Sequence, residues 1–251
     1  MIRVKNKKQL DGIRYSCKLL SEVYSVVIHN INPGATTEDL DKITREEIAK
    51  RNSKPAFLGY MGFPAALCTS LNNQVIHGIP SSKTVLKEGD ILSLDCGVIH
   101  NGFYSDAAVT IPVGKISNDA EKLLKITKES LYKGIEKARV GNRLMEISRA
   151  VYNHVTGNNM GVVREFCGHG IGMSLHEDPQ IPNYVNNGPN PRLKEGMVFA
   201  IEPMINAGTW KVNVLDDGWT VETQDGSLSA HFEHTIAILK DKAEILTGWK
   251  A

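Results

Sequence analysis

The sequence lacks the features that mark several classes of protein. Its four cysteines form no CxxC pair and lie among apolar neighbours, which argues against a disulfide framework and favours free thiols in a reducing cytoplasm. No apolar run approaches the roughly 18 residues that span a bilayer, and the basic N-terminus has no apolar signal core. The formal net charge is only +1, which gives no reason to expect general binding to nucleic acids or membrane surfaces.

An internal repeat organises the chain. Residues 87–95 read KEGDILSLD and residues 194–202 read KEGMVFAIE, an offset of 107 (194 − 87). Gly34 and Gly141 lie before similar acidic-apolar pairs and are separated by the same number (141 − 34 = 107). We therefore expect a single domain over residues 1–251, built from two pseudo-symmetric halves at about 1–112 and 113–251.

Each half is predicted to begin with two helices and continue with strands. Apolar residues at helical spacing indicate helices over 7–30, 37–51, 118–139 and 143–156. In the third of these, the predicted buried face carries Leu124, Leu131, Ile135 and Ala138. Val/Ile-rich segments follow each pair of helices. This order indicates an α+β fold with a curved sheet inside and helices outside.

The segment ILSLDCGVIHNGFYSDAAVTIPV carries the strongest local signal. Asn101-Gly102 between two strand-like runs predicts a type I′ hairpin in which His100 faces Phe103. In this register Asp95 and Asp106 lie on one face as diagonal neighbours, about 7–8 Å apart at the backbone. Both acids are then within reach of a shared ion.

Two further acids interrupt apolar strands, Glu202 in VFAIEPM and Glu233 in AHFEHTIAIL. An outward-facing position would explain either one alone. The repeat, however, makes Asp95 and Glu202 equivalent, which favours four carboxylates that converge on one interior. Burying an unpaired charge costs several kcal/mol, so such acids take up protons or bind cations. Two divalent cations would balance the charge of four carboxylates.

The run GHGIGMSLHEDP at 168–179 supplies a nitrogen ligand for such a site. Its glycines do not fit the dinucleotide fingerprint, and HED does not continue to the HExxH motif of zinc proteases. His169, between Gly168 and Gly170, is expected to approach a metal closely. One imidazole among oxygen ligands is unlike a structural zinc site and suits Mn, Fe or Co.

Together these residues resemble type I methionine aminopeptidases, nearly from end to end. The resemblance implies a pita-bread fold, in which two pseudo-symmetric halves enclose a dinuclear metal centre. It also implies the role of each ligand: Asp95 would chelate one metal, Asp106 and Glu233 would bridge both, and His169 and Glu202 would hold the other. The metals are expected to be two divalent ions chosen among Co, Mn, Fe and Zn.

The resemblance further implies catalytic groups that are not ligands. His77, in the motif HGIP, would hydrogen-bond the substrate backbone, and His176 would stabilise the tetrahedral intermediate. Glu233, or the hydroxide shared by the two metals, would shuttle the proton. The other histidines match no such role and are interpreted as surface or structural residues: His29, His100, His154, His231 and His234.

A methionine side chain needs a dry, polarizable pocket. The predicted lining, besides His77 and His176, is Tyr60, Phe63, Cys68 and Trp219. Plain core packing is the alternative interpretation of the run FLGYMGFPAALC at 57–68. Leu175 stands where an aromatic residue often lines the pocket of the family.

The predicted function is hydrolytic removal of the initiator methionine from nascent proteins and peptides when the second residue is small. We expect this aminopeptidase to mature proteins in the cytoplasm as a monomer, with no membrane partner and no specific nucleic-acid site. A transient ribosome contact stays open, although the loop LDDGWTVETQDG at 215–226 is acidic, which disfavours docking on ribosomal RNA.

Two alternatives remain. An Xaa-Pro peptidase of the same fold generally carries an extra N-terminal domain, whereas only 76 residues precede His77 here. The 25 residues between His176 and Glu202 also leave no space for the helical insertion of the type II enzymes. A pita-bread protein that only binds partners would lose ligands, and all five are present.

Overall fold

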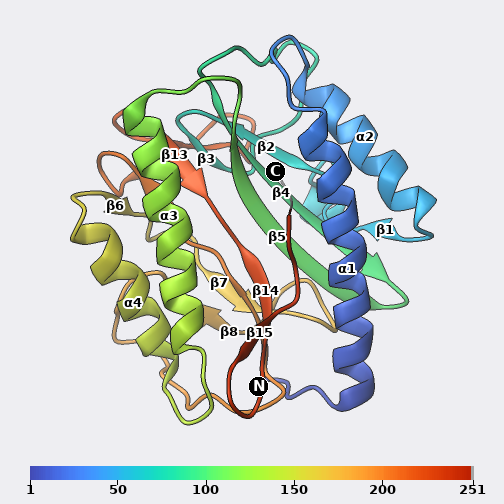
Figure 1. Ribbon diagram of the computed structural model, residues 1–251, viewed down its shortest axis with the longest axis vertical. Helices are drawn as coiled ribbons and strands as arrows, with labels where there is room; N and C mark the ends of the chain where they lie inside the picture. Colours follow the sequence, from blue (N-terminus) through green and yellow to red (C-terminus); the bar gives the residue numbers. More distant parts are fainter. Residues whose placement is uncertain (250–251) are drawn as a thin grey trace.

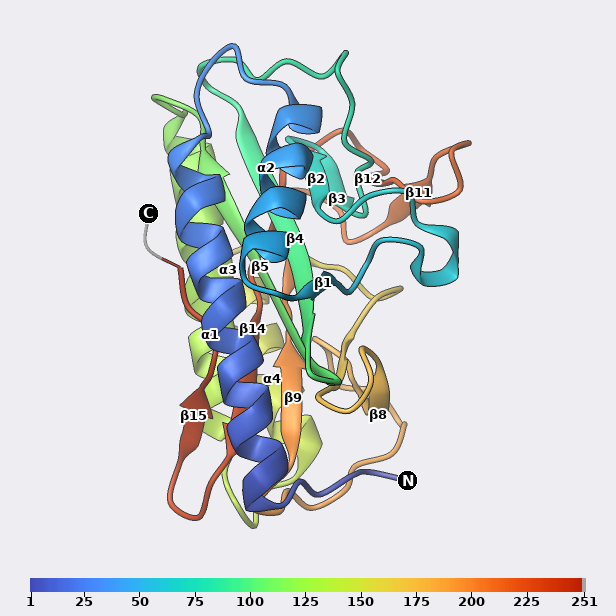
Figure 2. The same ribbon diagram turned by 90° about the vertical axis from the view of Figure 1, so that its right-hand side faces the viewer.

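The computed structural model describes residues 1–249 as four α-helices packed on antiparallel strands, which confirms the α+β class. The helices are α1 (Lys7–His29), α2 (Thr37–Lys50), α3 (Asn118–Lys137) and α4 (Leu144–Thr156). Figure 1 shows the strands between the pair α1–α2 and the pair α3–α4. In Figure 2 the helices lie on one side of the strands, and the segments around β11, β12 and β8 lie on the other.

The strands form four hydrogen-bonded sheets within residues 1–249 rather than one continuous ladder. The larger sheet of the first half contains β1 (Lys54–Pro55), β2 (Cys68–Leu71), β4 (Ile91–His100) and β5 (Phe103–Pro112). The larger sheet of the second half contains β7 (Gly168–Gly170), β8 (Glu177–Ile181), β9 (Val198–Ile201), β14 (His234–Ile238) and β15 (Ala243–Ile245). Two smaller sheets contain β3 (Gln74–Ile76), β11 (Val212–Val214) and β12 (Val221–Thr223), and β6 (Gly161–Val162), β10 (Met204–Asn206) and β13 (Ser229–His231).

The helices form where apolar residues recur at helical spacing, and they bury those faces against the strands. Thr36 caps α2 in a capping box with Asp39. On the predicted face of α3, Leu131, Ile135 and Ala138 are buried, whereas Leu124 is only partly buried and its neighbour Leu123 is fully buried. One residue turns a helix by 100°, so Leu124 lies at the edge of the stripe. No helix within residues 1–249 combines the length and apolar character needed to cross a membrane.

The hairpin of β4 and β5 has the predicted register. His100 lies opposite Phe103, and Asp106 lies opposite Gly97. Asn101 and Gly102 both have positive φ angles, 50° and 81°, as a type I′ turn requires. Asp95 and Asp106 therefore lie on one face of the hairpin.

The offset of 107 seen in the sequence recurs in the hydrogen bonds. The N–H of Gly34 donates to the carbonyl of Leu86 at 2.8 Å, and the N–H of Gly141 donates to that of Leu193 at 3.1 Å. Two isolated antiparallel bridges are related in the same way, Thr36 with Val85 and Arg143 with Arg192. These repeated contacts support the proposed division into two halves.

Threonine hydroxyls join the two halves where β5 of the first half lies beside β13 and β14 of the second. Thr235 Oγ1 donates to the carbonyl of Asp106 at 2.7 Å and accepts from its N–H at 3.2 Å. Two strand positions along, the N–H of Glu233 donates to the carbonyl of Ala108 at 2.8 Å. Farther along β5, Thr110 Oγ1 donates to the carbonyl of His231 and accepts from its N–H, both at 2.9 Å. We call these contacts of Thr235 and Thr110, with the backbone bond between Glu233 and Ala108, the threonine seam. The seam places Asp106 beside Glu233.

A buried ion pair ties the N-terminal segment to Glu177, the first residue of β8. Lys5 Nζ lies 2.7 Å from Glu177 Oε2, and the two side chains are 2% and 4% exposed. The other oxygen of Glu177 accepts the N–H groups of Met173 and Ser174, at 2.7 and 3.1 Å. The carboxylate thus organises the loop that leads to His176.

Replacing Lys5 by methionine should lower the free energy of unfolding by about 3–5 kcal/mol, because it leaves the charge of Glu177 buried without its partner. Lys42→Met removes an equally short pair with Glu38, but at an exposed position of α2, and should leave the urea midpoint unchanged. Urea unfolding followed by circular dichroism compares the two variants. Equal midpoints would mean that the buried pair contributes no more than the exposed one.

Candidate metal centre

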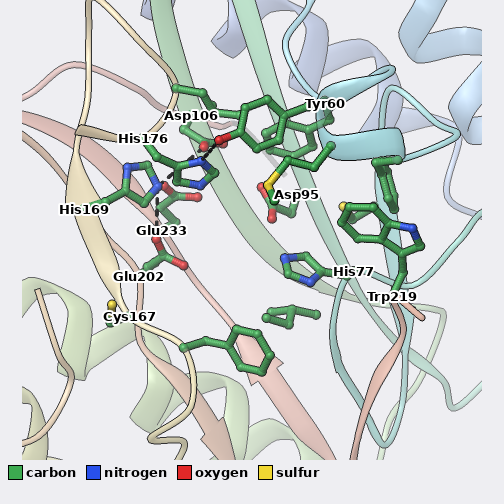
Figure 3. Close-up of a pocket in the computed structure, with 17 residues that line it drawn as sticks. Tyr60, His77, Asp95, Asp106, Cys167, His169, His176, Glu202, Trp219 and Glu233 are labelled. Carbon is green, nitrogen blue, oxygen red and sulfur yellow. Dashed lines mark hydrogen bonds and ion pairs between the residues drawn. The ribbon is translucent and has the colours of Figure 1, made fainter. Parts of the chain in front are cut away.

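The five predicted metal ligands come from five different strands or strand ends and face one another in the interior (Figure 3). Asp95 lies in β4, Asp106 in β5, His169 in β7, Glu202 directly after β9, and Glu233 between β13 and β14. The threonine seam fixes the relative position of Asp106 and Glu233, which belong to different halves. The structure thus brings together all five residues that the sequence singled out.

The ligand atoms lie close enough to share cations. One atom each of Asp106, His169 and Glu233 can be chosen so that all three lie within 4.8 Å of one another. His169 Nε2 is 3.4 Å from Glu202 Oε1 and 3.9 Å from Asp106 Oδ2. Asp95 lies on the same face as Asp106, one strand away.

These carboxylates are buried and under-satisfied. Asp95 Oδ1, Asp106 Oδ1 and Glu233 Oε1 are inaccessible to solvent and have no hydrogen-bond partner within residues 1–249. Leaving a charged oxygen in that condition costs several kcal/mol. Divalent cations remove this cost, so the donor set fits such ions.

Burial also shifts the pKa values of the cluster. It raises the pKa of Asp95 to about 7. Burial, followed by repulsion from neighbouring acids, raises the pKa of Asp106 and of Glu233 well above their usual values, and burial does the same for Glu202. Burial lowers the pKa of His169 to about 3, so its imidazole is neutral and free to bind a cation.

The glycines beside His169 lie against the backbone of neighbouring strands. A Cβ atom at Gly168 would lie 2.4 Å from the carbonyl oxygen of Ala200, and one at Gly170 would lie 2.2 Å from that of Asp178. Both glycines are therefore needed for β9 and β8 to approach β7, which carries His169.

A cavity of about 220 Å³, partly open to solvent, adjoins the carboxylates. All four predicted pocket residues line it, together with Leu175: Tyr60, Phe63, Cys68 and Trp219. Phe63 and Trp219 meet edge to face, with ring centroids 5.1 Å apart. Phe63, Cys68 and Trp219 pack in one cluster, and Cys68 lies directly opposite Asp95 on the neighbouring strand, so this apolar part of the lining adjoins the acids.

His77 lies on the cavity wall in a strained backbone conformation. Its φ is +59°, in the left-handed region that few non-glycine residues adopt. Gly78 follows with no room for a side chain, because a Cβ would lie 2.3 Å from the carbonyl oxygen of Thr69. The ring of His77 meets those of Phe166 and Trp219 edge to face, and burial lowers the pKa of His77 to about 4.

His176 lies at the mouth of the cavity and is held by Tyr60. Its Nδ1 is 2.8 Å from the hydroxyl of Tyr60, and its ring centroid is 4.4 Å from that of His169. The bond to Nδ1 leaves Nε2 available to a bound molecule. Tyr60 belongs to a short 3₁₀ turn, η1 (Tyr60–Gly62), whose Met61 is 82% exposed.

The remaining histidines are surface or buried residues, and one of them lies beside the acids. His29 is exposed, His100 and His154 bond Ser53 and Glu129, and His234 is buried against Thr247. His231, in contrast, is buried with its ring 3.7 Å from Glu202. The sequence holds a signal for it, since residues two apart in a strand share a face and Glu233 is two residues away.

Known proteins share this chain's sequence and fold. The family model described as metallopeptidase family M24 matches residues 11–240. A methionine aminopeptidase of Clostridium perfringens is 54% identical over 98% of this chain and 99% of its own. The crystal structure of a methionine aminopeptidase from Thermotoga maritima is 43% identical, with a TM-score of 0.96 over 98% of this chain and 99% of that one. A prolidase from Pyrococcus furiosus, 23% identical over 99% of this chain and 66% of its own, shares the fold with a TM-score of 0.76.

The raised acid pKa values predict how pH affects the stability of the metal-free protein. Above neutral pH the unfolded chain has released the protons that Asp106, Glu202 and Glu233 still partly hold in the folded state. Since the folded state then binds more protons, its free energy of unfolding falls as pH rises. The buried histidines act in the opposite direction, but only below their unfolded pKa of about 6.5.

With a chelator present, the free energy of unfolding of the metal-free protein should therefore fall between about pH 7 and pH 8.5. The fall should be steeper than with Mn²⁺ bound, because carboxylates that bind a metal ion are already deprotonated. The buried thiols contribute to the slope in both conditions, so the difference between the two slopes isolates the carboxylates. Urea titrations at several pH values, with and without Mn²⁺, measure it. Parallel slopes would contradict the raised acid pKa values.

Proposed function

The chain belongs to metallopeptidase family M24, and from that membership and the site's geometry we propose that it releases the N-terminal methionine of peptides and nascent proteins. The observation that carries this function is the juxtaposition of the carboxylate cluster with an apolar cavity. Its relatives named methionine aminopeptidase match it over nearly their whole length.

The family implies a divalent metal cofactor, and the unpaired buried oxygens of the cluster fit it. We assign two ions to the site: Asp95 would hold one, His169 and Glu202 the other, and Asp106 and Glu233 both. When bound, such ions lower the pKa of water and polarise a carbonyl group. Mn, Fe, Co and Zn all suit ligands of this type.

The chain's own side chains would then position the peptide and move the proton. Glu233 holds an unpaired oxygen towards the cluster, which suits it to accept a proton and pass it to the leaving amine. His176 is aimed by Tyr60, so its free Nε2 can donate to the oxygen on which charge develops. His77, neutral and fixed by its backbone, can bond the substrate's amide.

The apolar end of the cavity supports selection of methionine. Phe63, Cys68, Trp219 and Leu175 surround an unbranched side chain with polarizable, apolar groups, which thioethers favour. We further propose preference for a small second residue and action as a cytoplasmic monomer, with at most transient ribosome contact. Leu175 in place of an aromatic side chain is proposed to widen this end of the pocket.

The function is tested with metal-stripped protein and the peptides Met-Ala-Ser, Leu-Ala-Ser and Ala-Pro-Ser, before and after Mn²⁺ or Co²⁺ is added. Chromatography of the products should show metal-dependent release of methionine alone. Cleavage of the proline peptide instead would make the protein an Xaa-Pro peptidase of the same fold. Tight metal binding without any cleavage would indicate a binding protein.

His176→Ala should lower kcat for Met-Ala-Ser by roughly 10²–10⁴-fold, the range expected when an oxyanion or acid contact is lost. Metal affinity should be unchanged, because His176 is not an assigned ligand. His29→Ala, at the exposed end of α1, is the matched control and should retain full activity. Normal kcat in the His176 variant would restrict that residue to a structural role.

A further inference from the structure

His231 is a buried imidazole that neither the fold nor the proposed reaction uses. Its side chain is 2% exposed, and neither ring nitrogen has a hydrogen-bond partner within residues 1–249. Buried polar atoms are nearly always bonded, because an unmet donor or acceptor costs about 1–3 kcal/mol. The carboxylate nearest to the ring among residues 1–249 is that of Glu202, whose Oε2 is 3.7 Å from Nε2.

The backbone leaves His231 little freedom to point elsewhere. It pairs with Met204 in β10, and both its backbone polar groups bond Thr110 Oγ1 in the threonine seam. Side chains alternate along an extended segment, so Phe232 enters the core while His231 and Glu233 face the metal centre.

The two oxygens of Glu202 have different neighbours. Oε1 is 3.4 Å from Nε2 of His169, and Oε2 is 3.7 Å from Nε2 of His231. The carboxylate therefore lies between two imidazoles. A movement of about 0.5–0.7 Å brings the second contact to hydrogen-bond length.

We propose that His231 is a positioning residue, which donates a hydrogen bond to Glu202 Oε2 and so keeps Oε1 directed at the metal shared with His169. The neutral imidazole with its proton on Nε2 can donate this bond, and so can the protonated ring. Partners of this kind orient metal ligands and typically contribute 10–100-fold to metal affinity. The inference rests on the proposed metal site and deepens it.

The experiment compares Mn²⁺ binding by the wild-type protein, His231→Leu and His231→Gln, using calorimetry. Leucine keeps the volume but removes the donor, whereas glutamine places an amide N–H at a similar reach. We expect His231→Leu to weaken binding at one site by about 10–100-fold and His231→Gln to stay within about threefold of wild type. His154→Leu, at a partly buried position of α4 where the ring bonds Glu129, is the control for loss of a histidine.

Unchanged affinity in His231→Leu would overturn the proposal. Equal loss in the leucine and glutamine variants, with normal circular dichroism, would also overturn it, because His231 would then be a direct ligand. If the leucine variant does not fold, His231→Ala provides the apolar replacement. The proposed function fails separately, if wild-type protein binds the metal but releases no methionine.

Discussion

Four carboxylates concentrated in an apolar interior are the constraint on which this structure depends. Each is unfavourable alone, because burial raises its pKa and like charges repel, and Asp106 and Glu233 retain unpaired oxygens. Neither half of the chain supplies all of them. The threonine seam holds the two halves in the one arrangement that places these acids around a common centre. Folding and cation binding are thus two aspects of the same equilibrium.

The same constraint explains much of what surrounds the site. Glycines at 168 and 170 allow three strands to approach closely around His169. His77 keeps a left-handed backbone on the cavity wall. The ion pair between Lys5 and Glu177 organises the loop before His176 from a distance of 172 residues in the chain. Such features are costly in isolation, and they are typical of sites where geometry matters more than local stability.

Local patterns in the sequence were sufficient for part of this architecture. The Asn101-Gly102 turn specified the hairpin register, and with it the shared face of Asp95 and Asp106. The offset of 107 indicated that Glu202 is the counterpart of Asp95. The first inference uses short-range rules, turn geometry and strand alternation, which tertiary contacts rarely override. The second uses the similarity between two distant segments of the chain. The placement of Glu233 beside Asp106 needed the resemblance to a family, because the seam that joins them is made by side chains of distant residues.

Other features were beyond such rules or were overlooked. Nothing near Lys5 in the sequence indicates that Glu177 is its partner, and a helical stripe cannot distinguish Leu123 from Leu124 when both fit the period. The position of His231 was open to prediction, because a residue two positions from Glu233 along an extended segment shares its face.

The cavity also restricts when a substrate can be processed. Segments that contribute to its lining, before β8 and before β12, lie on the side of the strands away from the helices (Figure 2), and the cavity encloses the residues that would hold a chain end. A protein whose first residues are already folded into a helix or strand cannot extend them into it, so processing has to precede the folding of the substrate's own N-terminus.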